Sequence, residues 1–269
     1  MEITTRTLEV PGFRTTIRRQ GSGPALLLIQ GGGAGRNAWA ALMDRLSPHL
    51  DCIAFDNRGV GEASPVEGAL SIHDLARDAA AVIEGLGQGA VHVAGVSLGG
   101  FIAMRLAAAR PDLVRSLTLH ATAARLSPRT LEQNVFRSRL LEAAAADAPA
   151  LLRAYIRPWA AGAQGPIGDL PADVVTSREE FSERDYLGQM QAIREHDMTS
   201  DELRGIQAPT LVVAGAEDIL CSVEDARFLH RSIPGSKLVV LERAGHVYYY
   251  EEPELAAAIQ GGWVAQHAV

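Results

Sequence analysis

The stretch Gly95-Val96-Ser97-Leu98-Gly99 places one serine between two glycines, where an apolar segment gives way to a helical one. A serine that projects from a sharp strand-to-helix turn needs neighbours without side chains two positions away on either side, because strand and helix nearly touch there. Gly95 and Gly99 meet that requirement. The stretch therefore predicts a strand, a tight turn and a helix, with Ser97 presented as a nucleophile at the turn.

Short apolar runs and helical stretches alternate on both sides of this turn. Continuous apolar runs indicate strands that are covered on both faces, and their alternation with helices is typical of a parallel sheet with right-handed crossovers. Helical spacing is clearest at 71–86 and 98–110. The apolar runs lie at 25–30, 52–55, 91–96, 113–120, 210–214 and 238–241.

Two alternating segments at the start of the chain predict an antiparallel hairpin. They span 5–10 and 13–19, and Pro11-Gly12 separates them. Alternation with a Pro-Gly break is a hairpin signal. Together with the six apolar runs, the hairpin gives an α/β fold with a mostly parallel, eight-stranded sheet flanked by helices.

The alternation is interrupted once, by helical sequence without a convincing strand. Helical patterns cover 129–146, 150–159 and 177–196. We therefore expect a core domain made of residues 1–120 and 206–269. Residues 121–205 are expected to form an inserted helical cap, or lid, over the carboxyl edge of the sheet.

Two further polar residues follow predicted strands at the same sheet edge as Ser97. Asp218 follows the run 210–214, and His246 follows the run 238–241. A serine hydroxyl is a weak nucleophile until an imidazole accepts its proton, and that imidazole needs a carboxylate on its other nitrogen. We predict that Ser97, His246 and Asp218 form a catalytic triad. Neighbouring carboxylates that compete with Asp218 for this role are Glu217, Glu224 and Asp225.

Catalysis by such a triad also needs donors that stabilise the oxyanion. The backbone N–H of Leu98 is one expected donor. The glycine-rich loop at 30–35 follows a predicted strand and lets the backbone approach the substrate closely. We expect the second donor to be the N–H of Gly32, with that of Gly33 as the next choice.

These segments resemble the α/β-hydrolase superfamily, and the resemblance covers nearly the whole chain outside the lid. It rests on residues 30–35, 56–61, 95–100 and 209–218 and on Gly245-His246, with the triad in the order Ser, Asp, His. Gln30 stands where members usually have histidine. The stretch 191–197 and the apolar residues after it resemble enol-lactonase-like and carboxylesterase-like members.

Apolar and aromatic side chains near this edge are expected to form the substrate pocket. Largely apolar walls with few polar anchors suit an ester or lactone of modest size. The residues expected to bind substrate are Gly33, Trp39, Phe136, Trp159, Ile219 and Val247, with Phe101 and Tyr155 also near the pocket.

Other polar residues are expected to be structural. Asp56 and Arg58 follow a strand and precede glycines, which suits a buried network that tethers loops. We expect His92 and His120 to be hydrogen-bonded core histidines, with a place at the border of the pocket as the alternative for His120. His196 is expected at a solvated helix end, and the alternative is that it faces the substrate from the lid.

Composition excludes several classes of function. The net charge is −7, without a basic run, which argues against nucleic acid or an anionic membrane as partner. Two cysteines signal neither a disulfide framework nor a metal cluster. The first residues lack a signal-peptide pattern and no apolar run approaches membrane-spanning length, so we expect a cytoplasmic protein. The sequence leaves open whether it is a monomer or a homodimer.

The sequence thus predicts a carboxylic ester hydrolase that cleaves a small, largely apolar ester or lactone through an acyl-enzyme on Ser97, without a cofactor. Activity should rise with pH as His246 loses its proton. Two other enzymes fit the same triad, a thioesterase and a carbon–carbon bond hydrolase. A ligand receptor with this fold and very slow turnover is the alternative from another class.

Overall fold

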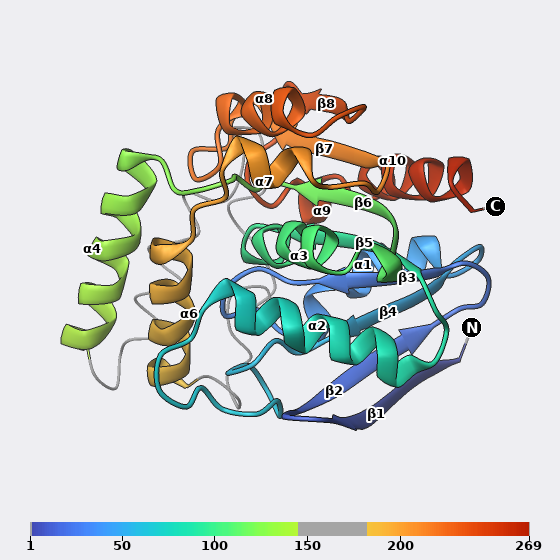
Figure 1. Cartoon of the computed structure of the whole chain (residues 1–269), viewed down its shortest axis with the longest axis horizontal. Coiled ribbons are helices and arrows are strands. Elements are labelled where there is room, and N and C mark those ends of the chain that lie inside the picture. Colours follow the sequence, from blue (N-terminus) through green and yellow to red (C-terminus); the bar gives the residue numbers. More distant parts are fainter. Residues whose placement is uncertain (1, 145–181, 269) are drawn as a thin grey trace.

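A computed structural model describes residues 2–144 and 182–268 (Figure 1). Its centre is one eight-stranded sheet in the order β1-β2-β4-β3-β5-β6-β7-β8. Strand β2 pairs antiparallel with both β1 and β4, and all other neighbours are parallel. This confirms the predicted mostly parallel sheet. The strands are β1 (Ile3–Val10), β2 (Phe13–Gln20), β3 (Ala25–Ile29), β4 (Asp51–Phe55), β5 (Val91–Val96), β6 (Val114–His120), β7 (Thr210–Gly215) and β8 (Lys237–Leu241).

Helices cover both faces of the sheet, so the apolar core has two layers. Helices α2 (Ile72–Leu86), α3 (Leu98–Ala109) and α8 (Val223–Ser232) pack on one face, and α1 (Ala40–Leu46), α9 (Tyr248–Glu251) and α10 (Pro253–Gln266) pack on the other. Successive side chains of a strand point to opposite faces. In β3, Leu27 accordingly joins the first layer and Leu28 the second.

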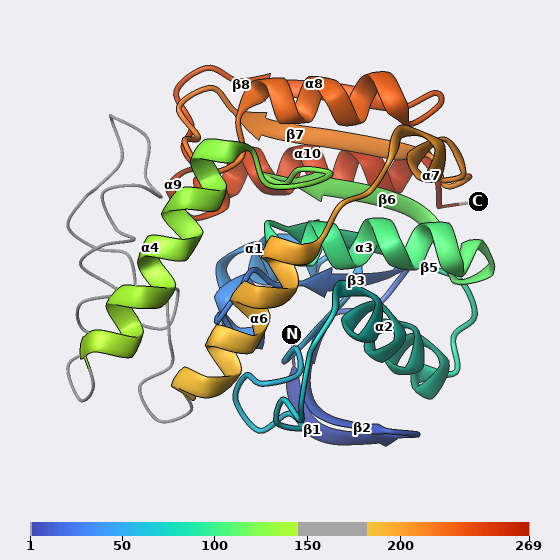
Figure 2. The same cartoon turned by 60° about the vertical axis from the view of Figure 1, so that its left-hand side comes forward.

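The described part of the predicted lid contains two long helices. These are α4 (Pro128–Ala144) and α6 (Glu183–Glu195), which pack against each other. Figure 2 shows both beyond the sheet, on the side to which the arrowheads of β3, β6 and β7 point. The expected helix at 150–159 lies outside the described residues.

A short helix, α7 (Ser200–Arg204), follows α6 and packs against the core helices α3 and α8. It ends at Arg204, two residues before the expected start of the second core segment at residue 206. The division into a core of 1–120 and 206–269 with a lid at 121–205 remains a prediction. Within the described ranges, no helix is both long and apolar enough to pass through a membrane.

Candidate active site

Ser97 lies at the turn between β5 and α3, in a backbone conformation that L-residues rarely adopt. Its φ is 55° and its ψ is −118°. The Ser97 N–H donates to the His120 carbonyl at 3.1 Å, and the Ser97 carbonyl accepts from the Gly100 N–H at 2.9 Å and the Thr122 hydroxyl at 2.9 Å. These hydrogen bonds hold the backbone on both sides of Ser97. They stabilise the turn that presents the serine side chain.

The two glycines that flank Ser97 are required by close backbone contacts. A Cβ at Gly95 would lie 2.1 Å from the Gly99 oxygen, and a Cβ at Gly99 would lie 2.0 Å from the Ile29 oxygen. Both distances are far below contact distance, and backbone atoms cannot move aside easily. The sequence signature therefore has the predicted cause, namely the close approach of strand and helix.

His246 and Asp218 meet although 28 residues separate them in the sequence. The Nδ1 of His246 lies 2.8 Å from Oδ2 of Asp218. Because an ionised carboxylate only accepts hydrogen bonds, the His246 Nδ1 carries the proton and donates. In the neutral ring, Nε2 is then free to accept a proton.

The Asp218 carboxylate is buried and held by the backbone. Its Oδ1 accepts from the N–H groups of Leu220 at 2.8 Å and Cys221 at 2.9 Å, which leaves Oδ2 for the imidazole. Two of the competing carboxylates are engaged elsewhere. Glu224 pairs with arginines on the surface, and Asp225 caps helix α8.

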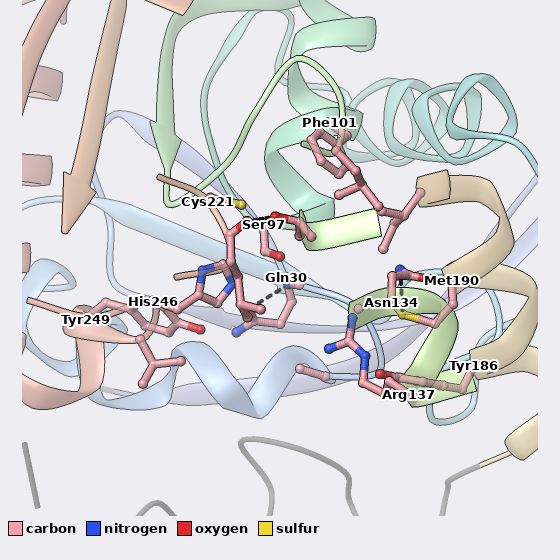
Figure 3. Close-up of a pocket in the computed structure, with 18 residues that line it drawn as sticks. Gln30, Ser97, Phe101, Asn134, Arg137, Tyr186, Met190, Cys221, His246 and Tyr249 are labelled. Atoms are coloured by element: carbon pink, nitrogen blue, oxygen red, sulfur yellow. Dashed lines mark hydrogen bonds between the residues drawn. The ribbon is translucent and has the colours of Figure 1, made fainter. Parts of the chain in front are cut away.

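Ser97 and His246 line one cavity of about 100 Å³ at the carboxyl edge of the sheet. Figure 3 shows Ser97 above the imidazole, in the middle of the group of lining residues. No direct hydrogen bond joins Ser97 to His246 within the described residues. Catalytic hydrogen bonds are often long in a free enzyme and tighten when substrate binds.

The glycine-rich loop passes beside Ser97 and presents few unpaired N–H groups. A Cβ at Gly31 would lie 3.4 Å from the Ser97 Cβ. The Gly31 N–H donates to Oε1 of Gln30 at 2.7 Å, and the Gly33 N–H donates to Oε1 of Gln189 at 2.9 Å. The Gly33 N–H is therefore hydrogen-bonded to a side chain of the lid helix α6 and is not available to the substrate.

The N–H groups of Gly32 and Leu98 remain as donors at this site. Neither has a hydrogen-bond acceptor among the residues that the structure describes. Leu98 is the first residue of α3, where an N–H has no partner inside the helix. This favours the expected pair, Gly32 and Leu98, as the oxyanion hole, and that role remains a proposal.

Gln30, which stands in the position usually held by histidine in the family, is wholly buried and lines the cavity. Its backbone carbonyl accepts from the Asn57 side chain at 3.0 Å. Its Oε1 holds the Gly31 N–H, while its Nε2 is buried without a partner. The side chain thus orients the start of the glycine-rich loop.

Some of the residues expected near the substrate line this cavity and others do not. Val247, Phe101 and Gly32 line the cavity, whereas Gly33 and Ile219 do not. Trp159 and Tyr155 lie outside the described residues.

Trp39 and Phe136, expected to bind substrate, do not line this cavity. Trp39 is fully buried in the core, where its ring lies 5.1 Å from that of Tyr249. Phe136 is 55% exposed on α4, because that helix turns its other face to the cavity.

Several cavity residues lack a signal in the sequence that could have found them. The lid face of the cavity is made of Thr130, Asn134 and Arg137 from α4 and Tyr186, Met190 and Ile193 from α6. To tell these lining residues from their neighbours in the sequence, one must know which face of each helix is turned to the cavity.

Cys221 also lines the cavity, next to the predicted triad. One ligand atom each from Asp218, Cys221 and His246 lies within 4.8 Å of the others, an arrangement the cysteine count did not indicate. Burial raises the pKa of the Cys221 thiol well above its ordinary value. Because the thiolate is the nucleophilic form, this thiol is a poor rival to Ser97.

The residues expected to be structural are largely so, with two differences. Asp56 and Arg58 do not pair with each other. Asp56 binds Arg36, and Arg58 binds Asp78 at 2.7 Å, so each tethers a different loop. His196 is buried against the Phe101 ring instead of solvated, with ring centroids 4.9 Å apart.

His92 and His120 are hydrogen-bonded in the core, although His92 Nε2 is buried without a partner. His92 Nδ1 lies 2.7 Å from the Ser116 hydroxyl, and His120 Nε2 lies 2.9 Å from Oε1 of Gln260. Both are almost fully buried.

Known proteins agree with this architecture. A protein of Klebsiella pneumoniae subsp. pneumoniae, provisionally named the carbamate hydrolase RutD, is 30% identical over 230 residues, which are 83% of this chain and 84% of that protein. A solved thermophilic esterase from Thermogutta terrifontis, with malate bound, has a TM-score of 0.83 at 25% identity and covers 100% of both chains. An enol-lactonase from Burkholderia xenovorans LB400 shares the fold, with a TM-score of 0.83, 23% identity and coverage of 97% of this chain and 100% of that one.

The family model described as the alpha/beta hydrolase fold matches residues 24–253. That span includes the nucleophile turn, both partners of the hydrogen-bonded pair and the glycine-rich loop. This chain belongs to the alpha/beta hydrolase family.

Proposed function

We propose that this α/β-fold hydrolase cleaves a carboxylic ester or lactone through a covalent acyl-enzyme on Ser97. The observation that carries the proposal is the 2.8 Å contact between His246 and Asp218 at the wall of the cavity that also holds Ser97. A serine nucleophile, a base and an acid that orients the base are the parts that acyl transfer requires.

In the proposed first step, the Ser97 oxygen attacks the carbonyl carbon and its proton passes to Nε2 of His246. Asp218 keeps the ring in the required tautomer and stabilises its positive charge. The N–H groups of Gly32 and Leu98 stabilise the oxyanion, and one such donor contributes about 3–4 kcal/mol in comparable sites. His246 then protonates the leaving alkoxide, and water cleaves the acyl-enzyme by the reverse sequence.

Carbamate hydrolysis is a second candidate. It is favoured by the 30% identity to a protein provisionally named as a carbamate hydrolase. A carbamate presents the same carbonyl carbon to Ser97, so the same residues serve both reactions. The two candidates differ only in the group attached to that carbon, which the triad does not recognise.

A substrate panel with one active-site variant tests the proposal. Short-chain esters, lactones, thioesters and carbamates are offered to the wild type and to Ser97→Ala. We expect ester or lactone turnover in the wild type and a fall in kcat of at least about a thousandfold in the variant, because the nucleophile is removed.

Ser232→Ala is the control, since Ser232 ends α8 and does not line the cavity. It should keep wild-type kinetics. Turnover that is unchanged in Ser97→Ala would refute the role of Ser97, and preference for a thioester or carbamate would redirect the substrate assignment.

A further inference from the structure

The lid face of the active-site cavity carries a cation, Arg137, that has no anionic partner among the described residues. Among the described residues that line the cavity, Arg137 is the only arginine or lysine, and none is a carboxylate. Its Nε is buried without a hydrogen-bond partner, and no ion pair of Arg137 occurs in the described part of the chain. A buried donor without an acceptor is costly unless a ligand supplies one.

Several other partly buried arginines of this chain are paired with carboxylates. Arg19 binds Asp51 at 2.6 Å, Arg58 binds Asp78 at 2.7 Å, and Arg105 binds Glu202. Arg18 and Arg194 bond instead to uncharged amide and hydroxyl oxygens. Arg137 has neither kind of partner among the described residues, and it lines the cavity. The difference points to an anion that arrives with the substrate.

The surroundings of Arg137 are electropositive. Arg194 on α6 donates to Oδ1 of Asn134 and to the Ser138 hydroxyl, both at 2.8 Å, and neither acceptor is charged. Burial, and to a lesser degree the charge of Arg137, lowers the pKa of Arg194. Glu142 and Glu195 act on Arg194 in the opposite sense but do not form an ion pair with it in the described residues.

The positive charge of Arg137 affects ionisable side chains that line the cavity. Burial raises the pKa of the Tyr186 hydroxyl, and Arg137 partly opposes that shift. Arg137 also opposes the much larger rise at Cys221, beside Asp218. In Figure 3, Arg137 and Tyr186 lie toward one end of the cavity and His246 and Tyr249 toward the other, with Ser97 between them.

We propose that Arg137 binds a carboxylate at the end of the substrate remote from the scissile carbonyl, so that the substrates are monoesters, lactones or carbamates that carry a second, anionic group. The proposal rests on the function proposed for Ser97. The planar guanidinium fork suits bidentate binding of a carboxylate, through Nε and one terminal nitrogen. Asn134, on the same helix, also lines the cavity, and its amide nitrogen lies 3.5 Å from the Met190 sulfur.

The test compares esters that differ only in the remote group. Monomethyl succinate, monomethyl glutarate and monomethyl adipate are each matched with the methyl ester of the monocarboxylic acid of equal length. Hydrolysis is followed by proton release. We expect the wild type to prefer at least one anionic ester by about tenfold or more in kcat/KM, in line with a hydrogen-bonded charge pair.

Arg137→Met should remove that preference, measured as the ratio of kcat/KM for each anionic ester to kcat/KM for its matched neutral ester, because it takes away the charge and keeps the length of the side chain. Arg137→Lys should keep part of the preference. Arg139→Met is the matched control, since Arg139 is exposed on the same helix. It should behave as the wild type.

A binding measurement makes the result independent of turnover. Ser97→Ala and the double variant Ser97→Ala, Arg137→Met are titrated with the same esters by calorimetry. Tighter binding of an anionic ester that disappears in the double variant supports the proposal. Equal affinity for anionic and neutral esters, or a preference that survives Arg137→Met, overturns it.

The two proposals fail separately. If Ser97→Ala retains full hydrolysis, the nucleophile assignment is wrong whatever Arg137 binds. If Ser97 is required but neutral esters are preferred in the wild type, only the anionic subsite is wrong.

Discussion

At the scale of single residues, Ser97 is kept in a backbone conformation that usually costs about 1–3 kcal/mol outside glycine. The structure around it supplies hydrogen bonds to both sides of its peptide unit. This local strain places the serine side chain at the cavity rather than against β5 or α3. In the proposed mechanism, activation of Ser97 depends on the hydrogen bond between His246 and Asp218.

Asp218→Asn tests how the base is oriented. The asparagine oxygen still accepts from the N–H groups of Leu220 and Cys221, so its amino group faces His246 Nδ1. That group donates, which moves the imidazole proton to Nε2 and removes the base. We expect kcat to fall by about 10⁴ with little change in melting temperature. Asp225→Asn, in the same region, should retain activity, and an active Asp218→Asn enzyme would contradict the assigned role.

The residue scale is also where prediction from sequence is weakest. Phe136 was expected in the pocket, but its neighbour Arg137 lines the cavity and Phe136 is exposed. One step along an α-helix turns the side chain by about 100°. Spacing shows which residues share a face, but the packing of α4 on α6 decides which face meets the cavity. The sheet edge that Ser97, Asp218 and His246 share was predictable, because strand ends fix it without reference to any helix face.

At the scale of elements, helix α6 is hydrogen-bonded to the glycine-rich loop and to the loop that follows β4. Gln189 is wholly buried and joins the Gly33 N–H at 2.9 Å and the Arg58 carbonyl at 2.8 Å. Four residues earlier, Asp185 accepts from the Val66 N–H at 3.0 Å. The lid helix therefore shapes the glycine-rich loop as well as covering the cavity.

Gln189→Ala should uncouple that loop from α6. It leaves a part-buried N–H and a part-buried carbonyl without their partner, so we expect the free energy of unfolding to fall by about 1–3 kcal/mol. We also expect kcat to decrease, because Gly32 adjoins the loosened residue. Denaturant unfolding and ester kinetics measure the two effects. Gln191→Ala is the control on the exposed side of α6, and identical behaviour of the two variants would argue against the coupling.

The strand-to-helix turn makes its own prediction. In Gly99→Ala the new Cβ would lie 2.0 Å from the Ile29 backbone oxygen, so we expect a loss of several kcal/mol or failure to fold. In Gly262→Ala, within α10, nothing lies within 4 Å of the new Cβ. There the gain in helix propensity should stabilise by about 0.5–1 kcal/mol. Thermal unfolding compares them, and an unperturbed Gly99→Ala protein would contradict the close approach.

Strands and helices were predictable where burial of their faces imposes a regular pattern of apolar residues on the sequence. Apolar runs located all the parallel strands, because both faces of this part of the sheet are covered. Helix α7 was not predicted, since five residues are too few to show periodicity. Its capping box, Thr199 with Glu202, is a local signal that could have found it.

At the scale of the whole molecule, three buried histidines couple folding to pH. Burial lowers the pKa of His92 and of His120 to about 4 and that of His196 to about 3, from an ordinary value of 6.5. Charge from Arg115 adds to the effect at His92, and charge from Arg105 adds to it at His196. The folded protein therefore keeps these rings neutral at pH values where the unfolded chain protonates them.

Stability should accordingly fall on acidification. Between about pH 6.5 and 4 the unfolded chain binds more protons than the folded one, so the free energy of unfolding decreases as pH is lowered through this range and is fully retained above it. Urea unfolding at a series of pH values measures the slope. His196→Gln should make the slope shallower, whereas His49→Gln, on the surface, should not. A slope that is unaffected by His196→Gln would show that this ring is not kept neutral by folding.

The most direct test of the account is covalent labelling with a fluorophosphonate, followed by mass spectrometry of the digested protein. The reagent modifies a serine only when a neighbouring base activates it, and it needs no knowledge of the natural substrate. The account predicts one adduct per chain on Ser97, with labelling abolished in Ser97→Ala and greatly slowed in His246→Gln. An unlabelled Ser97 in the folded wild type, or an adduct on another residue such as Cys221, would contradict it.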